Sequence, residues 1–380
     1  MSLSCKHRFE RATQVVYLDT SAEGLPVPEC EEAFREYYRA KARGTPGRRE
    51  FHAVETETIA LAAELLGTSP ANVALLSSAS DALNALATSI DWKPKDQVIV
   101  SDLEFPSNIL PWLRLRQMGV EVVVAVSDRG ALRWEQIATL ISPRTRLISL
   151  SLVSYKTGAY LPFVSKLSEA ARRVGAIVSI DATQALGRCP VSLEGVDYLI
   201  SSTFKWLLGP HGLSIVYVSP EFRKKLNPAG VGWYSVKNVF TEDRFENYEL
   251  KDGARCLSPG MPNFPSIYGL CQSLRFLLQV GIANIHEELK PLVAQLRQGV
   301  ADLGLNSLTP PEPEYASGIV SFASPRAESI GGLLEEKGII VWAGDGRVRA
   351  SVHLYNDASD IAKFLQVLAT EIVKRDLIYA

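Results

Sequence analysis

Between about residues 70 and 218, short apolar runs alternate with amphipathic segments. The runs are continuous and rich in Val, Ile and Leu, a pattern typical of strands covered on both faces by helices. Helical patterns between successive runs imply βαβ crossovers and therefore a mostly parallel sheet. The predicted strands cover residues 73–76, 97–100, 121–126, 147–152, 176–180, 198–201 and 213–218, and the predicted helices between them lie at 83–90, 109–118, 134–140 and 165–174.

The pattern changes on either side of this block. Two helices are predicted before it, at 31–42 and 55–66, joined by a polar stretch with Gly and Pro. Residues 227–265 are irregular and rich in Gly and Pro, and a long helical stretch at 267–303 follows, with a break at Gly281. A mixture of short strands and helices then runs to the end of the chain. The sequence therefore predicts an α/β protein with one large and one smaller C-terminal domain.

Composition narrows the possible functions. The 380 residues are 47% hydrophobic and 22% charged, with a net charge of −2, which is ordinary for a globular protein. The near-neutral charge argues against a protein that binds nucleic acid or an anionic membrane. The start of the chain lacks the apolar core of a signal peptide, and no apolar stretch is long enough to cross a bilayer. We therefore expect a cytoplasmic location.

The five cysteines are scattered, and no two form a CxxC pair. A disulfide framework or a structural zinc site is therefore not expected, and a reducing compartment is the default. The five histidines show no HExxH pattern, so no metal site is predicted.

Two strand ends carry the candidate chemistry. The apolar run at 176–180 ends in Asp181, where ligands of doubly wound sheets bind, although a turn or helix-cap aspartate is the more ordinary explanation of that residue alone. Lys205 lies between Phe204 and Trp206 after another strand. Burial there would lower the pKa of the lysine and make it nucleophilic, unless its stem packs and its ammonium extends into water. A lysine that forms a Schiff base and a carboxylate for a pyridine nitrogen are what pyridoxal 5′-phosphate needs.

At this point the chain resembles a known family. Asp181-x-x-Gln184 followed by Ser202-x-x-Lys205 is similar to the class V aminotransferases, which are fold-type I enzymes that use pyridoxal phosphate. The resemblance runs in order from Tyr17-Leu-Asp19 to the segment 348–356 and so covers nearly the whole chain. It implies a large cofactor-binding domain at residues 16–262 and a small C-terminal domain at 263–380, packed with residues 1–15.

The resemblance also implies roles for individual residues. Lys205 would carry the cofactor as a Schiff base and shuttle the Cα proton. Asp181 would pair with the pyridine nitrogen, Gln184 with the ring hydroxyl oxygen, and Ser202 with the phosphate.

Further cofactor contacts are implied at two turns. Residues Ser78, Ala79 and Ser80 stand where the family has a turn that opens a helix, whose amides and dipole suit a phosphate. A plain helix cap is the alternative role for Ser80. Phe105 stands where the family stacks an aromatic ring on the cofactor, unless it is an ordinary core residue.

For the substrate, the resemblance implies that Arg349 clamps the α-carboxylate, with a surface salt bridge as the alternative. Tyr155 replaces an Asn that desulfurases usually have near the substrate, and Trp342 stands near an extra desulfurase arginine. Together with Arg347 and His52, these two residues are candidates for recognising the substrate side chain.

Other positions depart from the family pattern. Phe204 replaces a His that many relatives have beside the cofactor phosphate. Met261 lies in a turn that reaches the phosphate of the partner subunit in family dimers, where only its backbone N–H could serve. The short turn at 343–347 has no cysteine where desulfurases carry a mobile loop with the sulfur-accepting thiolate.

These features predict a homodimeric enzyme that acts on an amino acid, with its active sites at the subunit interface. Aminotransferase chemistry is the main expectation. A C–S lyase is the first alternative. An epimerase, a kynureninase-like hydrolase and an inactive protein of the same fold that serves as a binding or scaffold module remain open.

Overall fold

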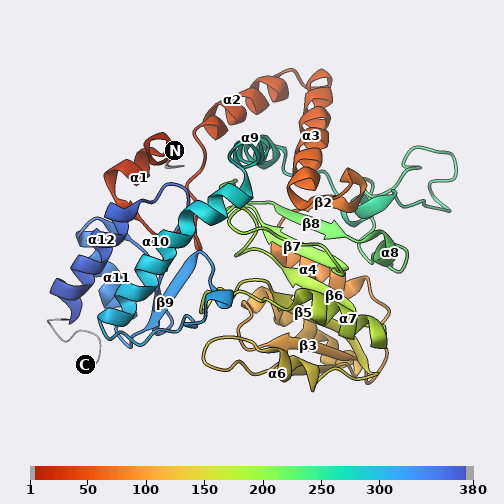
Figure 1. The fold of residues 1–380 in the computed structure, drawn as a ribbon. Coiled ribbons are helices and arrows are strands. Elements are labelled where there is room, and N and C mark those ends of the chain that lie inside the picture. The colour runs from red at the N-terminus through yellow and green to blue at the C-terminus, as the bar shows by residue number, and fades with distance from the viewer. Residues whose placement is uncertain (1–4, 374–380) are drawn as a thin grey trace.

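The computed structural model describes residues 5–373, which form two connected regions around separate sheets (Figure 1). The larger sheet has seven strands in the order β2-β8-β7-β6-β5-β3-β4. Only β8 runs antiparallel to its neighbours, so the predicted mostly parallel sheet is confirmed. The strands are β2 (Val73–Leu76), β3 (Gln97–Ser101), β4 (Glu121–Ala125), β5 (Thr145–Ser151), β6 (Ile177–Asp181), β7 (Tyr198–Ser202) and β8 (Ser214–Val218).

Both faces of this sheet are buried, which explains the continuous apolar runs. Val98 and Val100 belong to the core beneath α4 (Ala79–Thr88) and α5 (Leu110–Arg114), whereas Ile99 belongs to the core beneath α7 (Val164–Val174). The exception is β4. It is the edge strand, and Val124 is exposed, so the expectation of a strand covered on both faces is wrong there.

Three helices from distant parts of the chain pack together beside the sheet. These are α2 (Glu29–Ala42), α3 (Arg48–Leu66) and α9 (Phe264–Val280). Helix α3 begins at Arg48, well before the predicted residue 55, because residues 48–54 are mostly polar or exposed, and Phe51 alone among them is buried, which is too little for an apolar periodicity. Gly281, with φ of 84°, separates α9 from α10 (Ile282–Asp302), and the predicted break is confirmed.

The C-terminal region contains a three-stranded antiparallel sheet in the order β11-β12-β9. Figure 1 shows α10 running between this region and the large sheet. The apolar pattern at 361–372 predicts a last helix there, and the helix α12 starts three residues earlier, at Ala358, because the Asp357 side chain caps its N-terminus. The elements are β9 (Ile319–Ala323), α11 (Ala327–Glu336), β10 (Ile339–Ile340), β11 (Trp342–Gly344), β12 (Arg347–Ser351) and α12 (Ala358–Val367), followed by a π-helical stretch at Leu368–Val373.

The N-terminal segment lies against the C-terminal region. The two-residue strand β1 (Val16–Tyr17) pairs with β10, and Phe9, just before α1 (Glu10–Gln14), packs edge-on against Tyr355. The boundary at residue 262 stays a prediction. The remaining short helices are α6 (Trp134–Ala138), α8 (Pro220–Arg223), and the 3-10 turns Lys6–Arg8, Thr45–Gly47, Pro70–Asn72, Pro106–Asn108, Leu115–Met118, Gly253–Leu257 and Pro313–Tyr315.

No helix within residues 5–373 combines the length and the apolar character that a membrane span requires.

Candidate active site

A pocket of about 190 Å³ lies at the carboxyl ends of β5, β6 and β7, where a parallel sheet places its ligands. It brings together every predicted cofactor-contacting residue except Met261. Tyr155, a predicted substrate residue, also belongs to its wall. The pocket is lined by Ser78, Ala79, Ser80, Phe105, Ser107, Ser151, Val153, Tyr155, Asp181, Thr183, Gln184, Ser202, Phe204 and Lys205.

Lys205 is the nucleophile candidate of the pocket. Its Nζ lies 5.5 Å from the ring centroid of Phe105 and 5.6 Å from that of Phe204. Burial, with the nearby Arg349 guanidinium, lowers the pKa of Lys205 to about 8 against the opposing effect of Asp181. A large fraction of its amine is therefore neutral, and nucleophilic, at mildly alkaline pH.

The N-terminal loop fixes the backbone of Lys205. The N–H of Gly24 donates a 2.8 Å hydrogen bond to the carbonyl of Phe204. A Cβ at residue 24 would lie only 1.9 Å from the carbonyl oxygen of Lys205. Only glycine permits this approach, so Gly24 positions the lysine although it lies far away in sequence.

Asp181 is a buried carboxylate with its side chain on the pocket wall. Its Oδ1 accepts a 2.9 Å hydrogen bond from the N–H of Thr183, and burial raises its pKa. The Thr183 hydroxyl oxygen in turn accepts a 3.1 Å bond from the N–H of Ser202. Thr183 thus joins the ends of β6 and β7. The sequence interpretation missed it, although it lies inside the Asp181-x-x-Gln184 motif.

Gln184 is held at both ends of its amide. Its Nε2 donates to the carbonyl of Ser21 at 2.9 Å, and its Oε1 accepts from the indole N–H of Trp206 at 2.6 Å. One N–H of the amide therefore remains free to donate into the pocket.

The predicted phosphate turn lies at the N-terminus of α4. Ser78 caps the helix by accepting a 3.0 Å hydrogen bond from the N–H of Asp81. The hydroxyls of Ser80 and Ser107 lie 2.8 Å apart, so both can turn toward an anion at the positive end of the helix. Ser107 and Ser151 were not predicted, although Ser151 ends a strand just as Asp181 does.

The predicted substrate residues gather on β11 and β12. The Nη1 of Arg349 donates a 2.7 Å hydrogen bond to the carbonyl of Tyr155. The indole of Trp342 lies 4.9 Å from the Arg349 guanidinium and 4.6 Å from that of Arg347. Arg349 and Trp342 are not part of the pocket wall, but Arg349 is close enough to Lys205 to influence its pKa.

Asp19 accompanies this group. Burial raises its pKa to about 7 against the opposing charge of Arg349, and its Oδ1 has no hydrogen-bond partner among the described residues. An isolated bridge to Ser351 places Asp19 beside the strand that carries Arg349. In the sequence Asp19 was only part of the motif that opened the resemblance, and its proximity to Arg349 was not foreseen.

Two predicted residues lie away from the pocket. Met261 is exposed in the turn before α9. His52 lies on α3, where its Nδ1 is 3.3 Å from the hydroxyl of Tyr234 and 3.5 Å from a carboxylate oxygen of Glu55. Neither residue reaches the pocket formed by this single chain.

The residues present fit pyridoxal phosphate. Asp181 has a buried carboxylate, bonded to the N–H of Thr183, that suits the pyridine nitrogen. The N-terminus of α4 suits the phosphate, and the Lys205 amine, with its lowered pKa, suits the aldehyde. The turn between β11 and β12 is only Asp345–Gly346, which leaves no room for a loop. No cysteine of the described chain lines the pocket, and all but the half-buried Cys5 are buried.

Comparison with known proteins agrees with this geometry. The model of the family described as aminotransferase class-V matches residues 16–364. The uncharacterized aminotransferase YcbU of Bacillus subtilis (strain 168) is 30% identical, over 82% of this chain and 82% of its own length. The cysteine desulfurase structure of Thermococcus onnurineus NA1 is similar with a TM-score of 0.89 and 25% identity, covering 97% of each chain.

The structure of the cystine C–S lyase C-DES has a TM-score of 0.87 at 21% identity and covers 95% of this chain and 99% of its own, a likeness of fold. The family match spans most of the chain and includes the strand ends that carry Asp181 and Lys205. The chain therefore belongs to the class-V aminotransferase family and is one of its pyridoxal phosphate-dependent enzymes.

Proposed function

We propose that this enzyme is a C–S lyase, which expels a sulfur substituent from Cβ of a cysteine-like amino acid. One observation carries the proposal: the pocket combines a reactive lysine and a nearby buried arginine with no cysteine to accept sulfur. The likeness to a cysteine desulfurase and to a cystine C–S lyase supports chemistry at sulfur. Without an acceptor thiolate, the sulfur leaves as a free thiol.

The cofactor site follows from the pocket wall. When bound, pyridoxal phosphate supplies an electrophilic carbon for amines and a ring that delocalises the electron pair left on Cα. Lys205 would hold that carbon, Asp181 would keep the pyridine nitrogen protonated, and Gln184 would donate its free N–H to the ring oxygen. The N-terminus of α4 would bind the phosphate through the amides of Ser78, Ala79 and Ser80 and the two serine hydroxyls, with Ser202 alongside, and Phe105 and Phe204 would border Lys205.

Arg349 and Lys205 act on the substrate itself. The Arg349 guanidinium donates one N–H to the carbonyl of Tyr155 and has other N–H groups that would bind the α-carboxylate of the substrate. With the substrate bound, the Nζ of Lys205 would be the base that accepts the proton from Cα. Its pKa of about 8 suits this role, since the group then exchanges protons near the working pH.

The chemistry of the leaving group fits a pocket that has Phe105 where a proton donor could stand. The electron pair released at Cα forms a double bond to Cβ as the Cβ–S bond breaks, and sulfur departs as a thiolate. Phe105 cannot donate a proton, but a thiolate needs little help because its conjugate acid has a pKa of only about 8.5. The released enamine then takes up water to give pyruvate and ammonium.

Transamination, the main expectation from sequence, is the second candidate, and the 30% identity to an uncharacterized aminotransferase favours it. It uses the same residues as far as Cα deprotonation and differs only in where the proton returns. The same holds for epimerisation. Cystine or S-methylcysteine, given to the holoenzyme without a keto acid, separates these reactions. Repeated release of pyruvate and thiol supports the lyase, whereas one turnover that stops at the amine form of the cofactor supports transamination.

We also propose that the enzyme is a homodimer whose segment 227–265 contacts the partner. Phe240, Phe245 and Trp233 in this segment are exposed, which is unusual for large apolar side chains that have no partner. Met261 lies at the end of the same segment. Light scattering should give twice the mass of one chain, and Phe240→Asp with Phe245→Asp should shift the enzyme toward the monomer. A wild-type monomer would refute this arrangement.

A further inference from the structure

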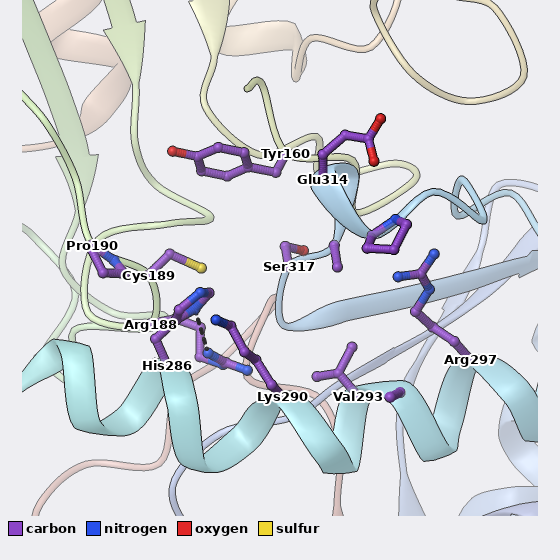
Figure 2. A pocket seen from close by; sticks show the side chains of 13 residues that line it. Tyr160, Arg188, Cys189, Pro190, His286, Lys290, Val293, Arg297, Glu314 and Ser317 are labelled. Atoms are coloured by element: carbon purple, nitrogen blue, oxygen red, sulfur yellow. Dashed lines mark hydrogen bonds between the residues drawn. The ribbon is translucent and has the colours of Figure 1, made fainter. Parts of the chain in front are cut away.

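A second cavity, of about 660 Å³, lies apart from the active site and shares no wall residue with it. It lies between the connection from β6 to β7, one side of α10, residues 313–317 before β9, and Tyr160 in the connection after β5. Figure 2 shows the side chains of these four segments around the same space. Its volume is within the range of sites that bind small molecules, roughly 300–1,000 Å³.

The inner end of the cavity is formed by Arg188, a buried cation without an ionic partner. The side chain is only 1% exposed, its Nε donates to the carbonyl of Val352 at 3.1 Å, and its Nη1 lies 3.4 Å from Nδ1 of His286. Within residues 5–373 no carboxylate forms an ion pair with it. A buried charge of this kind is costly unless an opposite charge compensates it.

The backbone makes room for this guanidinium. A Cβ at Gly318 would lie 3.0 Å from Nε of Arg188 and 2.7 Å from the ring of Trp206. Burial also lowers the pKa of Arg188, as expected for a cation removed from water. The fold therefore accommodates an unneutralised arginine at the end of a cavity, rather than on the surface where water would solvate it.

Lys290 and Arg297 of helix α10 add further positive charge to the same cavity. With His286 they are spaced four and seven residues apart, which places all three on one side of the helix, and Figure 2 shows them along the cavity. Burial, Arg188 and Lys290 all lower the pKa of His286, so its imidazole is neutral at neutral pH and adds no charge. Lys290 does pair with Glu287, at 2.7 Å, but Glu287 is exposed and is not part of the wall.

A single carboxylate, that of Glu314, belongs to the wall, and Figure 2 shows it at the end away from Arg188. Arg297, at the other end of the row, donates to the carbonyl of Pro310. The potential inside the cavity is therefore positive, and it is strongest where the deepest group, Arg188, lies.

Apart from Ser317, the rest of the wall is mostly apolar. Pro190, Val293, Ala294, Pro313, Ala316 and the ring of Tyr160 enclose the space between the cationic groups. A bare inorganic anion would leave this surface in contact with water. An anion with an apolar body would instead bury it while its charged group meets Arg188.

We propose that this cavity binds a small organic carboxylate with an apolar body, its carboxylate on Arg188 and its body against α10. The site is separate from the substrate site, since neither Lys205 nor Arg349 is part of its wall. Its ligand is therefore not the amino acid that the enzyme converts.

The test is calorimetric titration of the holoenzyme with 3-phenylpropionate. One saturable site per chain is expected, and binding should weaken at least about tenfold for the uncharged 3-phenylpropionamide and for inorganic phosphate, which lack the charge and the apolar body respectively. No saturable binding at millimolar concentration, or equal binding of the amide, would overturn the proposal. Equal binding of phosphate would also overturn it, because the apolar wall would then contribute nothing.

Variants test whether the ligand binds in this cavity. Arg188→Met should weaken the binding of 3-phenylpropionate about tenfold or more. Ala294→Trp fills the cavity from the exposed side of α10 and should weaken binding as much while leaving the buried arginine unchanged. Ala301→Trp, exposed on the same helix outside the cavity, should bind like the wild type. Arg349→Ala should also retain binding. Loss of binding in Arg349→Ala alone, with Arg188→Met and Ala294→Trp unchanged, would assign the ligand to the substrate site and refute the proposal.

Discussion

The indole N–H of Trp206 donates a 2.6 Å hydrogen bond to the side-chain oxygen of Gln184 in the buried wall of the active site. Because Trp206 follows Lys205 directly, this bond connects the two motifs that carry the cofactor chemistry. The amide nitrogen of Gln184 is held by Ser21 at the same time. The amide therefore has one orientation, with one N–H left for the cofactor ring.

Replacing Gln184 tests this arrangement. Gln184→Leu leaves the indole N–H without a buried partner, which should lower the stability of the protein by about 1–3 kcal/mol. It also removes the donor to the cofactor. A lost hydrogen bond of about 1–2 kcal/mol should lower the affinity for pyridoxal phosphate roughly 5- to 30-fold in an absorbance titration of the cofactor-free protein. Trp206→Phe keeps an aromatic ring at this position and leaves the free amide N–H of Gln184 in place, so it should lower the cofactor affinity less than Gln184→Leu. Equal affinity in Gln184→Leu and the wild type would contradict the assigned role.

The lowered pKa of Lys205 predicts how the protein takes up its cofactor as pH changes. Burial favours the neutral amine, which is the form that reacts with an aldehyde. Below a pKa of about 8 the neutral fraction drops tenfold per pH unit, so the rate at which cofactor-free protein captures pyridoxal phosphate should fall in proportion. Above it the rate should level off. A rate that continued to rise up to the ordinary lysine pKa of 10.5 would show that burial does not act on Lys205 in this way.

Gly24 should matter for the active site although it binds nothing there. Gly24→Ala places a methyl group against the carbonyl oxygen of Lys205 and should cost about 1–3 kcal/mol in overpacking. The backbone shift should reduce both cofactor affinity and kcat. Gly332→Ala, on α11 with open space around the new Cβ, is the matched control and should behave like the wild type. If both variants retain wild-type activity, the close contact between Gly24 and Lys205 is not needed for function.

The cysteines should be dispensable for turnover. Burial raises the pKa of Cys189, Cys256 and Cys271, so these thiols stay protonated and unreactive. Cys5→Ser, which removes the half-buried thiol, followed by iodoacetamide treatment should leave sulfur elimination unchanged. Intact-protein mass spectrometry during turnover should detect no added sulfur atom. A covalent persulfide on any cysteine would instead point to a desulfurase.

Much of the fold follows from local patterns. Continuous apolar runs predicted the buried strands, and the rule that ligands lie at strand ends identified Asp181 and Lys205. The same rule applied to β5 would have found Ser151. Where the local signal was weak, the prediction failed. The first turns of α3 are mostly polar with only Phe51 buried, and the apolar strand β4 lies at an edge that its composition does not reveal.

Contacts between distant parts of the chain could not be predicted from the sequence. The approach of Asp19 to the strand of Arg349 joins residues more than three hundred positions apart, and no periodicity encodes it. The same is true of Gly24 beside Lys205 and of the cationic cavity at Arg188, whose parts come from four separate segments. Each of these contacts depends on how whole elements pack, which single-residue preferences do not determine.

Elimination at sulfur is the central claim, and its most direct test is the fate of cystine with the holoenzyme in the absence of any keto acid. We expect pyruvate, ammonium and the sulfur product to accumulate over many turnovers, with the cofactor spectrum unchanged at the end. Lys205→Ala should abolish the reaction, since it removes the base at Cα. A single turnover per active site, ending with the cofactor in its amine form and an oxo acid that retains the sulfur, would contradict the account and identify a transaminase.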